Sequence, residues 1–118
     1  MVIIYYEVFK MINNDNTQYL LAALIEIYRG QAVPLPESDP ELEKNLLCDV
    51  YSSAISFARF DESRQALSED IFRCSREGAT VREEMERVQE QTPDVLNAKM
   101  IAAAHMMKVF NPGRYTLS

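Results

Sequence analysis

Three helix-start signals restrict the fold of this chain more than any other feature of its sequence. In each signal a serine or threonine, which can cap a helix, precedes a first turn that contains proline or an acid. The three signals are Ser38-Asp39-Pro40-Glu41, Thr80-Val81-Arg82-Glu83 and Thr92-Pro93-Asp94. Such residues satisfy the free N–H groups at a helix start. The signals therefore predict helices that begin near residues 38, 80 and 92.

The longest predicted helical stretch follows the first signal, with neither glycine nor proline between Pro40 and Gly78. Mostly apolar residues recur along it every three or four positions, which would place them on one face of a helix. They are Leu42, Leu46, Val50, Ala54, Phe57, Phe60, Arg64, Leu67, Ile71 and Cys74. The pattern fits one helix of nearly forty residues, or two helices separated near Phe60-Asp61-Glu62, where Asp61 could cap the second. Because typical helices are much shorter, we expect the break.

The other segments complete a prediction of about five helices. Residues 2–12 are almost continuously apolar and fit a strand or a buried helix; we expect a helix, since no later segment offers a strand partner. Residues 13–16 predict a turn, Asp15 and Gln18 a capping box for a helix to about Arg29, and Gly30 a left-handed stop. We predict a single all-α domain over residues 1–118, an orthogonal bundle around one core, with a long central helix that can be broken near residue 61.

Charge and hydropathy narrow the functional classes. The net charge of −6 divides into −5 for residues 1–58, −3 for residues 59–90 and +2 for residues 91–118. Nucleic-acid binding rests on clustered positive charge, so it is not favoured. The apolar N-terminal run follows no basic residue, and Glu7 and Lys10 interrupt it well short of the roughly 20 residues of a membrane span. We predict a cytoplasmic protein that does not cross a membrane.

Residue types that carry chemistry are sparse. The single histidine, His105, has no acid three or four residues away that could orient it as a general base. Cys48 and Cys74 match no metal-binding or redox spacing, and we interpret them as buried free thiols. The paired acids are interpreted as solvated helix faces with intrahelical ion pairs, namely Asp61 to Arg64, Glu69 to Arg73 and Glu83 to Arg87. We predict no enzymatic activity, and neither catalytic residue, metal nor cofactor.

The apolar seam from residue 57 to 74 suggests an interface. Its alternating spacing is that of a coiled-coil seam, which packs within the monomer or against a second copy. A nearly unbroken helix would expose more apolar face than short helices can cover, which predicts a homodimer. The last helix adds methionines that suit either core packing or adaptable binding. The candidate interface residues are Phe57, Phe60, Arg64, Leu67, Ile71, Arg73 and Arg76.

A family resemblance covers residues 1–80. Tyr5 and Tyr6 lie in an apolar first segment, Leu20-Leu21-Ala22-Ala23-Leu24-Ile25-Glu26-Ile27-Tyr28-Arg29-Gly30 precedes a proline loop, and the next helical stretch ends in Arg73-Cys74-Ser75-Arg76-Glu77-Gly78-Ala79. This pattern resembles the helical N-terminal domain of phage and prophage replisome-organiser-like proteins. The resemblance implies a helical fold and a phage or mobile-element origin. The acidic stretch from Val81 to Gln91 replaces the basic, glycine-rich linker of such proteins.

Three functional hypotheses follow. The first is a non-enzymatic module that binds an unidentified protein partner. The second is a nucleic-acid-associated accessory protein that uses Arg59, Arg64, Arg73, Arg76, Arg82 and Arg87. The third is a small-ligand-binding domain, which would be supported by a deep pocket that contains His105 and a buried carboxylate.

Overall fold

A computed structural model describes residues 16–110 of the chain, and these residues form helices and loops without a strand. The helices are α2 (Thr17–Tyr28), α3 (Pro40–Ala54), α4 (Asp61–Glu77), α5 (Val81–Arg87) and α6 (Pro93–Phe110), and two short 3-10 turns, η1 (Ile55–Phe57) and η2 (Val88–Glu90), follow α3 and α5. The predicted all-α class is confirmed. The helix expected over residues 2–12 and the cap expected at Asp15 lie outside the described residues.

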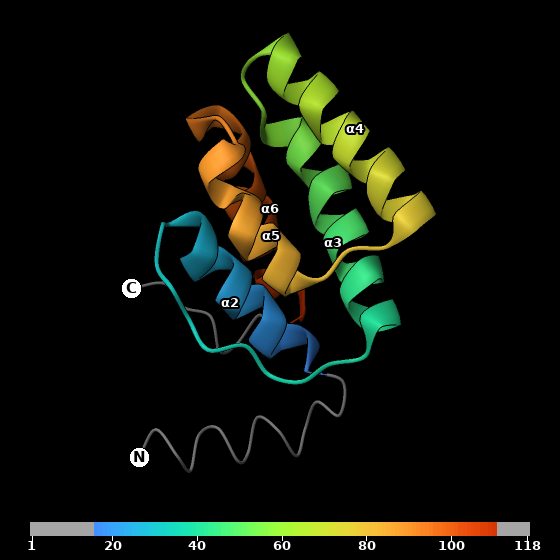
Figure 1. Ribbon diagram of the computed structural model, residues 1–118. Helices are drawn as coiled ribbons and strands as arrows, with labels where there is room; N and C mark the ends of the chain where they lie inside the picture. Colours follow the sequence, from blue (N-terminus) through green and yellow to red (C-terminus); the bar gives the residue numbers. More distant parts are fainter. Residues whose placement is uncertain (1–15, 111–118) are drawn as a thin grey trace.

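The predicted break in the long helical stretch is confirmed. Helix α3 ends in η1, Ala58 adopts an extended backbone, and α4 begins at Asp61. Figure 1 shows the result, in which α3 and α4 lie side by side and run in opposite directions. Asp61 is the first helical residue rather than the cap; the cap position belongs to Phe60, whose side chain cannot accept a hydrogen bond.

The helix caps follow the sequence signals with one correction. Thr80 accepts a hydrogen bond from the N–H of Glu83 at 3.1 Å, and Thr92 accepts one from the N–H of Val95 at 3.4 Å, as predicted. At the start of α3 the cap is Asp39, not Ser38: the Asp39 carboxylate accepts from the N–H of Glu41 at 2.9 Å. Since Pro40 is the first helical residue, the residue directly before it takes the cap position.

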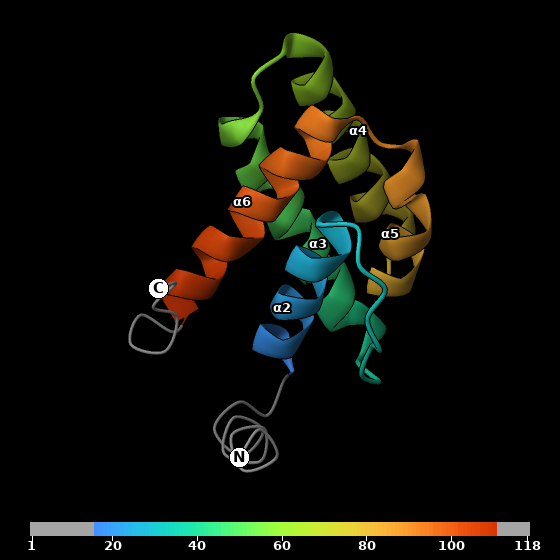
Figure 2. The same cartoon turned by 90° about the vertical axis from the view of Figure 1, so that its left-hand side faces the viewer.

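The core lies where α6 packs against α2 and α3, and α4 covers the other side of α3. Figure 2 shows α6 crossing α3 obliquely, with α2 beside them. Leu20, Leu24, Leu47, Val50 and Leu67 have no exposed surface. Gly30 and Gly78, which follow α2 and α4, have positive φ angles of 91° and 79°, the left-handed side of the map that favours glycine.

The homodimer was predicted because a long, nearly unbroken helix would expose its apolar seam, and the structure has no such helix between residues 38 and 78. Leu67 and Val50, two residues of the long seam, are fully buried within one chain because the break folds α4 back onto α3. Phe57 and Ile71 are half-buried, and Phe60 is 56% exposed. The homodimer itself stays a prediction. Among residues 16–110, no helix has the length and apolar character needed to cross a membrane.

Replacing Asp39 tests the corrected cap. Asp39→Ala should lower the free energy of unfolding by about 1 kcal/mol, because the N–H of Glu41 loses its acceptor. Ser38→Ala is the matched control. The Ser38 hydroxyl is buried and meets no hydrogen-bond partner in the described part of the chain, so its removal should change stability by less than about 0.5 kcal/mol or raise it. Urea unfolding followed by circular dichroism measures both, and the reverse order would restore Ser38 as the cap.

Candidate functional site

A buried lysine, Lys99 on α6, is the centre of the polar structure of this protein. Its side chain has no exposed surface, and its ammonium group donates three hydrogen bonds. The acceptors are Asp70 Oδ2 at 2.9 Å, Glu84 Oε2 at 2.9 Å and Gln91 Oε1 at 2.6 Å. All three protons of the ammonium are thereby used. A charge so far from water is tolerated only with such partners.

Two tyrosines complete the surroundings of Lys99. The Tyr28 hydroxyl on α2 donates to Glu84 Oε2 at 2.6 Å. The ring of Tyr51 on α3 lies 4.5 Å from the lysine nitrogen, a cation–π distance. The Tyr51 hydroxyl is buried and meets no partner in hydrogen-bonding geometry among the described residues. We call the set Tyr28, Tyr51, Asp70, Arg73, Glu84, Arg87, Gln91 and Lys99 the Lys99 network.

Two arginines connect the Lys99 network to the surface. Arg73 contacts Asp70 Oδ1 at 3.0 Å, and Arg87 contacts the same oxygen at 3.3 Å. Burial alone would raise the pKa of Asp70, but the Lys99 charge and hydrogen bond, with Arg87 and Arg73, lower that pKa below its usual value. Asp70 therefore stays ionised and holds three cations around one carboxylate.

The paired acids Glu69-Asp70 and Glu83-Glu84-Glu86 were expected on solvated helix faces, and that expectation is wrong for Asp70 and Glu84. Asp70 is 6% exposed and Glu84 is 1% exposed. Within residues 16–110, Arg73 pairs with Asp70 instead of Glu69, and Arg87 pairs with Glu84 and Asp70 instead of Glu83. The expected pair of Asp61 with Arg64 is present.

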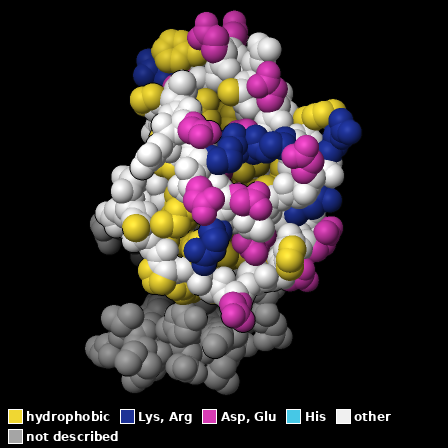
Figure 3. Space-filling view, viewed as in Figure 1, with side chains coloured by type: hydrophobic (Ala, Val, Ile, Leu, Met, Phe, Trp, Pro, Cys, Tyr) yellow, Lys and Arg dark blue, Asp and Glu magenta, His cyan; other side chains and the backbone are white. Residues whose placement is uncertain are grey.

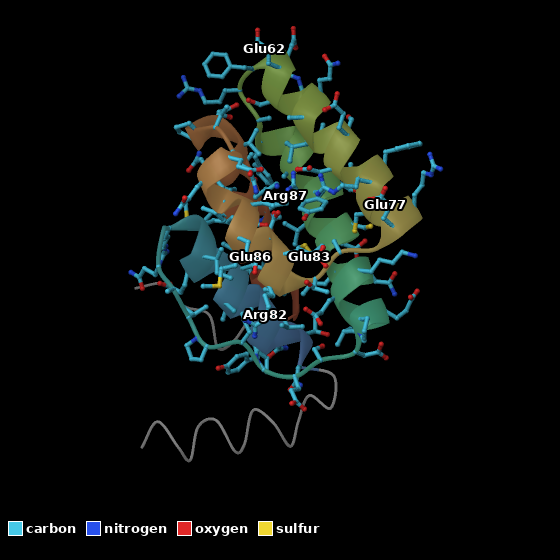
Figure 4. The ribbon with its side chains drawn as sticks, viewed as in Figure 1. Glu62, Glu77, Arg82, Glu83, Glu86 and Arg87 are labelled. Atoms are coloured by element: carbon cyan, nitrogen blue, oxygen red, sulfur yellow. The ribbon has the colours of Figure 1, made fainter. Side chains whose placement is uncertain are left out.

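A groove of about 550 Å³ lies over the network, between α4 and the segment that joins α5 to α6. Its floor includes Asp70, Arg73, Arg87 and Gln91, and Phe60 lies at its rim. Figure 4 shows Arg87 between α5 and α4, with Glu62 toward the beginning of α4. In Figure 3 positive side chains cross the middle of this face, and acidic side chains surround them. The groove is thus the surface through which the Lys99 network meets solvent.

Asp94, near the start of α6, fixes the rim of the groove. Its carboxylate accepts a hydrogen bond from the N–H of Arg59 at 3.0 Å. A hydrogen bond from Ser63, and further ones from the Arg59 and Phe60 backbone, lower the pKa of Asp94. These bonds attach the turn between α3 and α4 to α6. They therefore position Phe60 beside the groove.

The predicted interface residues do not form one surface. Phe60 and Arg73 line the groove, whereas Leu67 is fully buried in the core. The guanidinium of Arg64 pairs with Asp61 and donates to the Ala58 carbonyl at 2.9 Å. Ile71 is half-buried against the core. Arg76 lies over the ring of Phe72, with its guanidinium carbon 5.3 Å from the ring centre.

His105 lies away from the groove. It is exposed on α6 and meets the edge of Phe57 with ring centres 5.9 Å apart. The groove does contain a buried carboxylate, Asp70, but His105 is not among its lining residues. The pocket that would support the small-ligand hypothesis is therefore not formed around His105. Among residues 16–110, no three histidine, cysteine, aspartate or glutamate side chains gather as a metal site.

Comparison with known proteins gives no relative: no protein-family model, no curated protein and no solved structure matches this chain. The function of the protein is therefore inferred from the site itself.

Replacing Lys99 tests the role of the network. Lys99→Met should lower the free energy of unfolding by about 3–5 kcal/mol, because it removes the fully buried ammonium that pairs with the carboxylates of both Asp70 and Glu84. Lys108→Met, at an exposed position of the same helix, is the control and should change stability by less than about 0.5 kcal/mol. Denaturant unfolding measures both variants. Equal stability of the two would show that the network is dispensable.

Replacing Tyr28 and replacing Tyr51 should have different effects on stability, although both side chains are buried. Tyr28→Phe should cost about 1.5–3 kcal/mol, since Glu84 loses a hydrogen bond to a charged group. Tyr51→Phe should cost less, because within the described part of the chain the Tyr51 hydroxyl meets no partner in hydrogen-bonding geometry. The measurement is again the free energy of unfolding. A larger loss for Tyr51→Phe would contradict the assignment.

Tyr28 and Tyr51 also determine how the stability of the protein should change at high pH. Burial, followed by the negative charge of Glu84, raises the pKa of both Tyr28 and Tyr51 above the usual value. A raised pKa means that the neutral tyrosine stabilises the fold fully below pH of about 10, where the unfolded side chain begins to ionise, and progressively less above it. Tyr28→Phe should make the loss of stability above that pH less steep, as unfolding titrations would show.

Proposed function

We propose that this protein binds another protein through the groove, and that the bound segment carries basic side chains around an apolar anchor. The observation that carries the proposal is Phe60, which is 56% exposed at the groove rim. Leaving a large aromatic side chain in water forgoes roughly 1.5–3 kcal/mol relative to burial. Exposed aromatic side chains beside a polar rim are typical of protein interfaces.

The charge of the groove supports a basic partner. Five carboxylates line it, from Glu62, Glu69, Asp70, Glu90 and Asp94, together with the two guanidinium groups of Arg73 and Arg87. Both guanidinium groups already contact Asp70, whereas Glu62, Glu69 and Glu90 are exposed toward solvent. The groove therefore has an excess of negative charge. Complementary charge speeds association and selects the partner.

The arrangement of the arginines supports this proposal over a nucleic-acid role. Of the six arginines that the nucleic-acid hypothesis names, three have acidic partners, namely Arg64, Arg73 and Arg87, and Arg76 lies over the ring of Phe72. Arg59 and Arg82 are exposed to solvent. A protein that neutralises phosphates needs cations that are free to replace counterions. The phage or mobile-element origin, the homodimer and the cytoplasmic location stay predictions beside this proposal.

Peptide selection on the immobilised full chain tests the proposal without a known partner. Peptides selected from a random display library should carry lysine or arginine near one aromatic or aliphatic residue. Their affinity should fall about tenfold or more with Phe60→Ala, as expected for a residue that anchors an interface. Glu90→Lys and added salt should also weaken binding, because both reduce the attraction between the groove and a basic peptide.

Phe72→Ala is the matched control for this experiment. Phe72 is 61% exposed on α4 but does not line the groove, so its removal should leave peptide affinity unchanged. Equal losses for Phe60→Ala and Phe72→Ala would contradict a groove-directed interaction. Salt-sensitive binding of duplex DNA, weakened by Arg73→Ala and Arg76→Ala in a mobility-shift titration, would favour the nucleic-acid hypothesis instead.

A further inference from the structure

The two cysteines, which are 26 residues apart in sequence, meet in the fold. Cys48 on α3 and Cys74 on α4 have their sulfur atoms 2.9 Å apart. They were expected to be buried free thiols, because their spacing in the sequence matches no metal-binding or redox motif. The break at residues 58–60 creates the encounter, since it lays α4 antiparallel along α3 (Figure 1).

The surroundings of the two thiols are unequal. Cys74 has no exposed surface and donates toward the Lys44 carbonyl at 3.4 Å. Burial, followed by the contact with Cys48, raises the pKa of the Cys74 thiol to about 12. Cys48 is half-buried, and its sulfur lies 3.9 Å from the Ser75 hydroxyl near the surface. Cys48 is therefore the thiol that a reagent in solution reaches first.

We infer that Cys48 and Cys74 are a site of reversible oxidation, where a low-molecular-weight disulfide such as oxidised glutathione closes an intramolecular bond between α3 and α4. The sulfurs must approach by only about 1 Å to reach the length of a disulfide.

The reaction is a pair of thiol–disulfide exchanges. The Cys48 thiolate attacks one sulfur of oxidised glutathione, the bond between the two glutathione sulfurs breaks, and one glutathione thiolate leaves. The Cys74 thiolate then attacks the Cys48 sulfur and displaces the second glutathione. Two electrons and two thiol protons pass from the protein to two glutathione molecules. The buried Cys74 has to deprotonate for the second step, so that step should accelerate as pH rises.

Closure would restrain the wall of the groove. Helix α4 carries Asp70 and Arg73 and follows directly after Phe60, and the new bond would attach the last turns of α4 to the middle of α3. The segment from residue 48 to residue 74, which includes the turn at residues 58–60, would then be a covalently closed loop. The inference concerns the chemistry of the thiols and is independent of the partner proposed for the groove.

Mass spectrometry of the full chain tests the inference. After incubation with oxidised glutathione, removal of the reagent and alkylation, the native protein should have lost the mass of two hydrogen atoms and carry no alkyl group. Dithiothreitol should reverse the change. The oxidised protein should melt about 10 °C higher than the reduced protein, because the bond restricts the unfolded chain.

Cys74→Ser supplies the control, because it should retain one glutathione on Cys48. The inference is overturned if the wild-type protein instead keeps a stable glutathione adduct, forms disulfides between chains, or leaves both thiols open to alkylation. Should Cys74→Ser fail to fold, the mass of the wild-type protein decides alone.

Discussion

A lysine ammonium that is withdrawn from water must find its acceptors within hydrogen-bonding distance, and here each of the other α-helices in residues 16–110 contributes to its surroundings. Asp70 comes from α4, Glu84 from α5, Tyr51 from α3, and Tyr28 reaches the same site from α2 through Glu84. Apolar packing tolerates small shifts of one helix against another. A hydrogen-bonded charge does not, because a displaced partner leaves an unpaired ion in the core. The Lys99 network therefore fixes the relative positions of helices that hydrophobic contact alone would hold less specifically.

The same network links the interior to the groove. One oxygen of Asp70 faces Lys99, and the other receives Arg73 and Arg87 at the groove floor. Because Asp70 is shared, the guanidinium groups are held in place by a residue that is itself anchored in the core. At the rim, Asp94 accepts a hydrogen bond from the N–H of Arg59 and so holds the backbone next to Phe60 in place. The groove is thus built on rigid supports, which lowers the entropy cost of binding a partner.

Local signals in the sequence predicted much of the fold, and non-local ones were missed. Caps at Thr80 and Thr92 and the break before Asp61 depend on neighbouring residues, so the sequence contains them. The Lys99 network was missed, although a signal exists: Lys99 lies four residues from both Val95 and Ala103, on the buried stripe of its helix. Asp70 lies between Leu67 and Cys74 in the same way. The groove and the contact of Cys48 with Cys74 require knowing how α3 and α4 fold together, which periodicity cannot supply.

The position of Lys99 in the last described helix has a consequence for biosynthesis. Asp70 and Glu84 are made before Lys99, and both bond the same ammonium nitrogen. Until α6 leaves the ribosome, these two carboxylates lack the buried ammonium and share only the guanidinium of Arg87, which is partly exposed to solvent. Their mutual repulsion then opposes bringing them together in a forming core. The earlier helices should therefore stay loosely associated during translation. Once α6 arrives, the apolar stripe and the missing positive charge are delivered together, so that the described part of the chain acquires its core in one late, cooperative step.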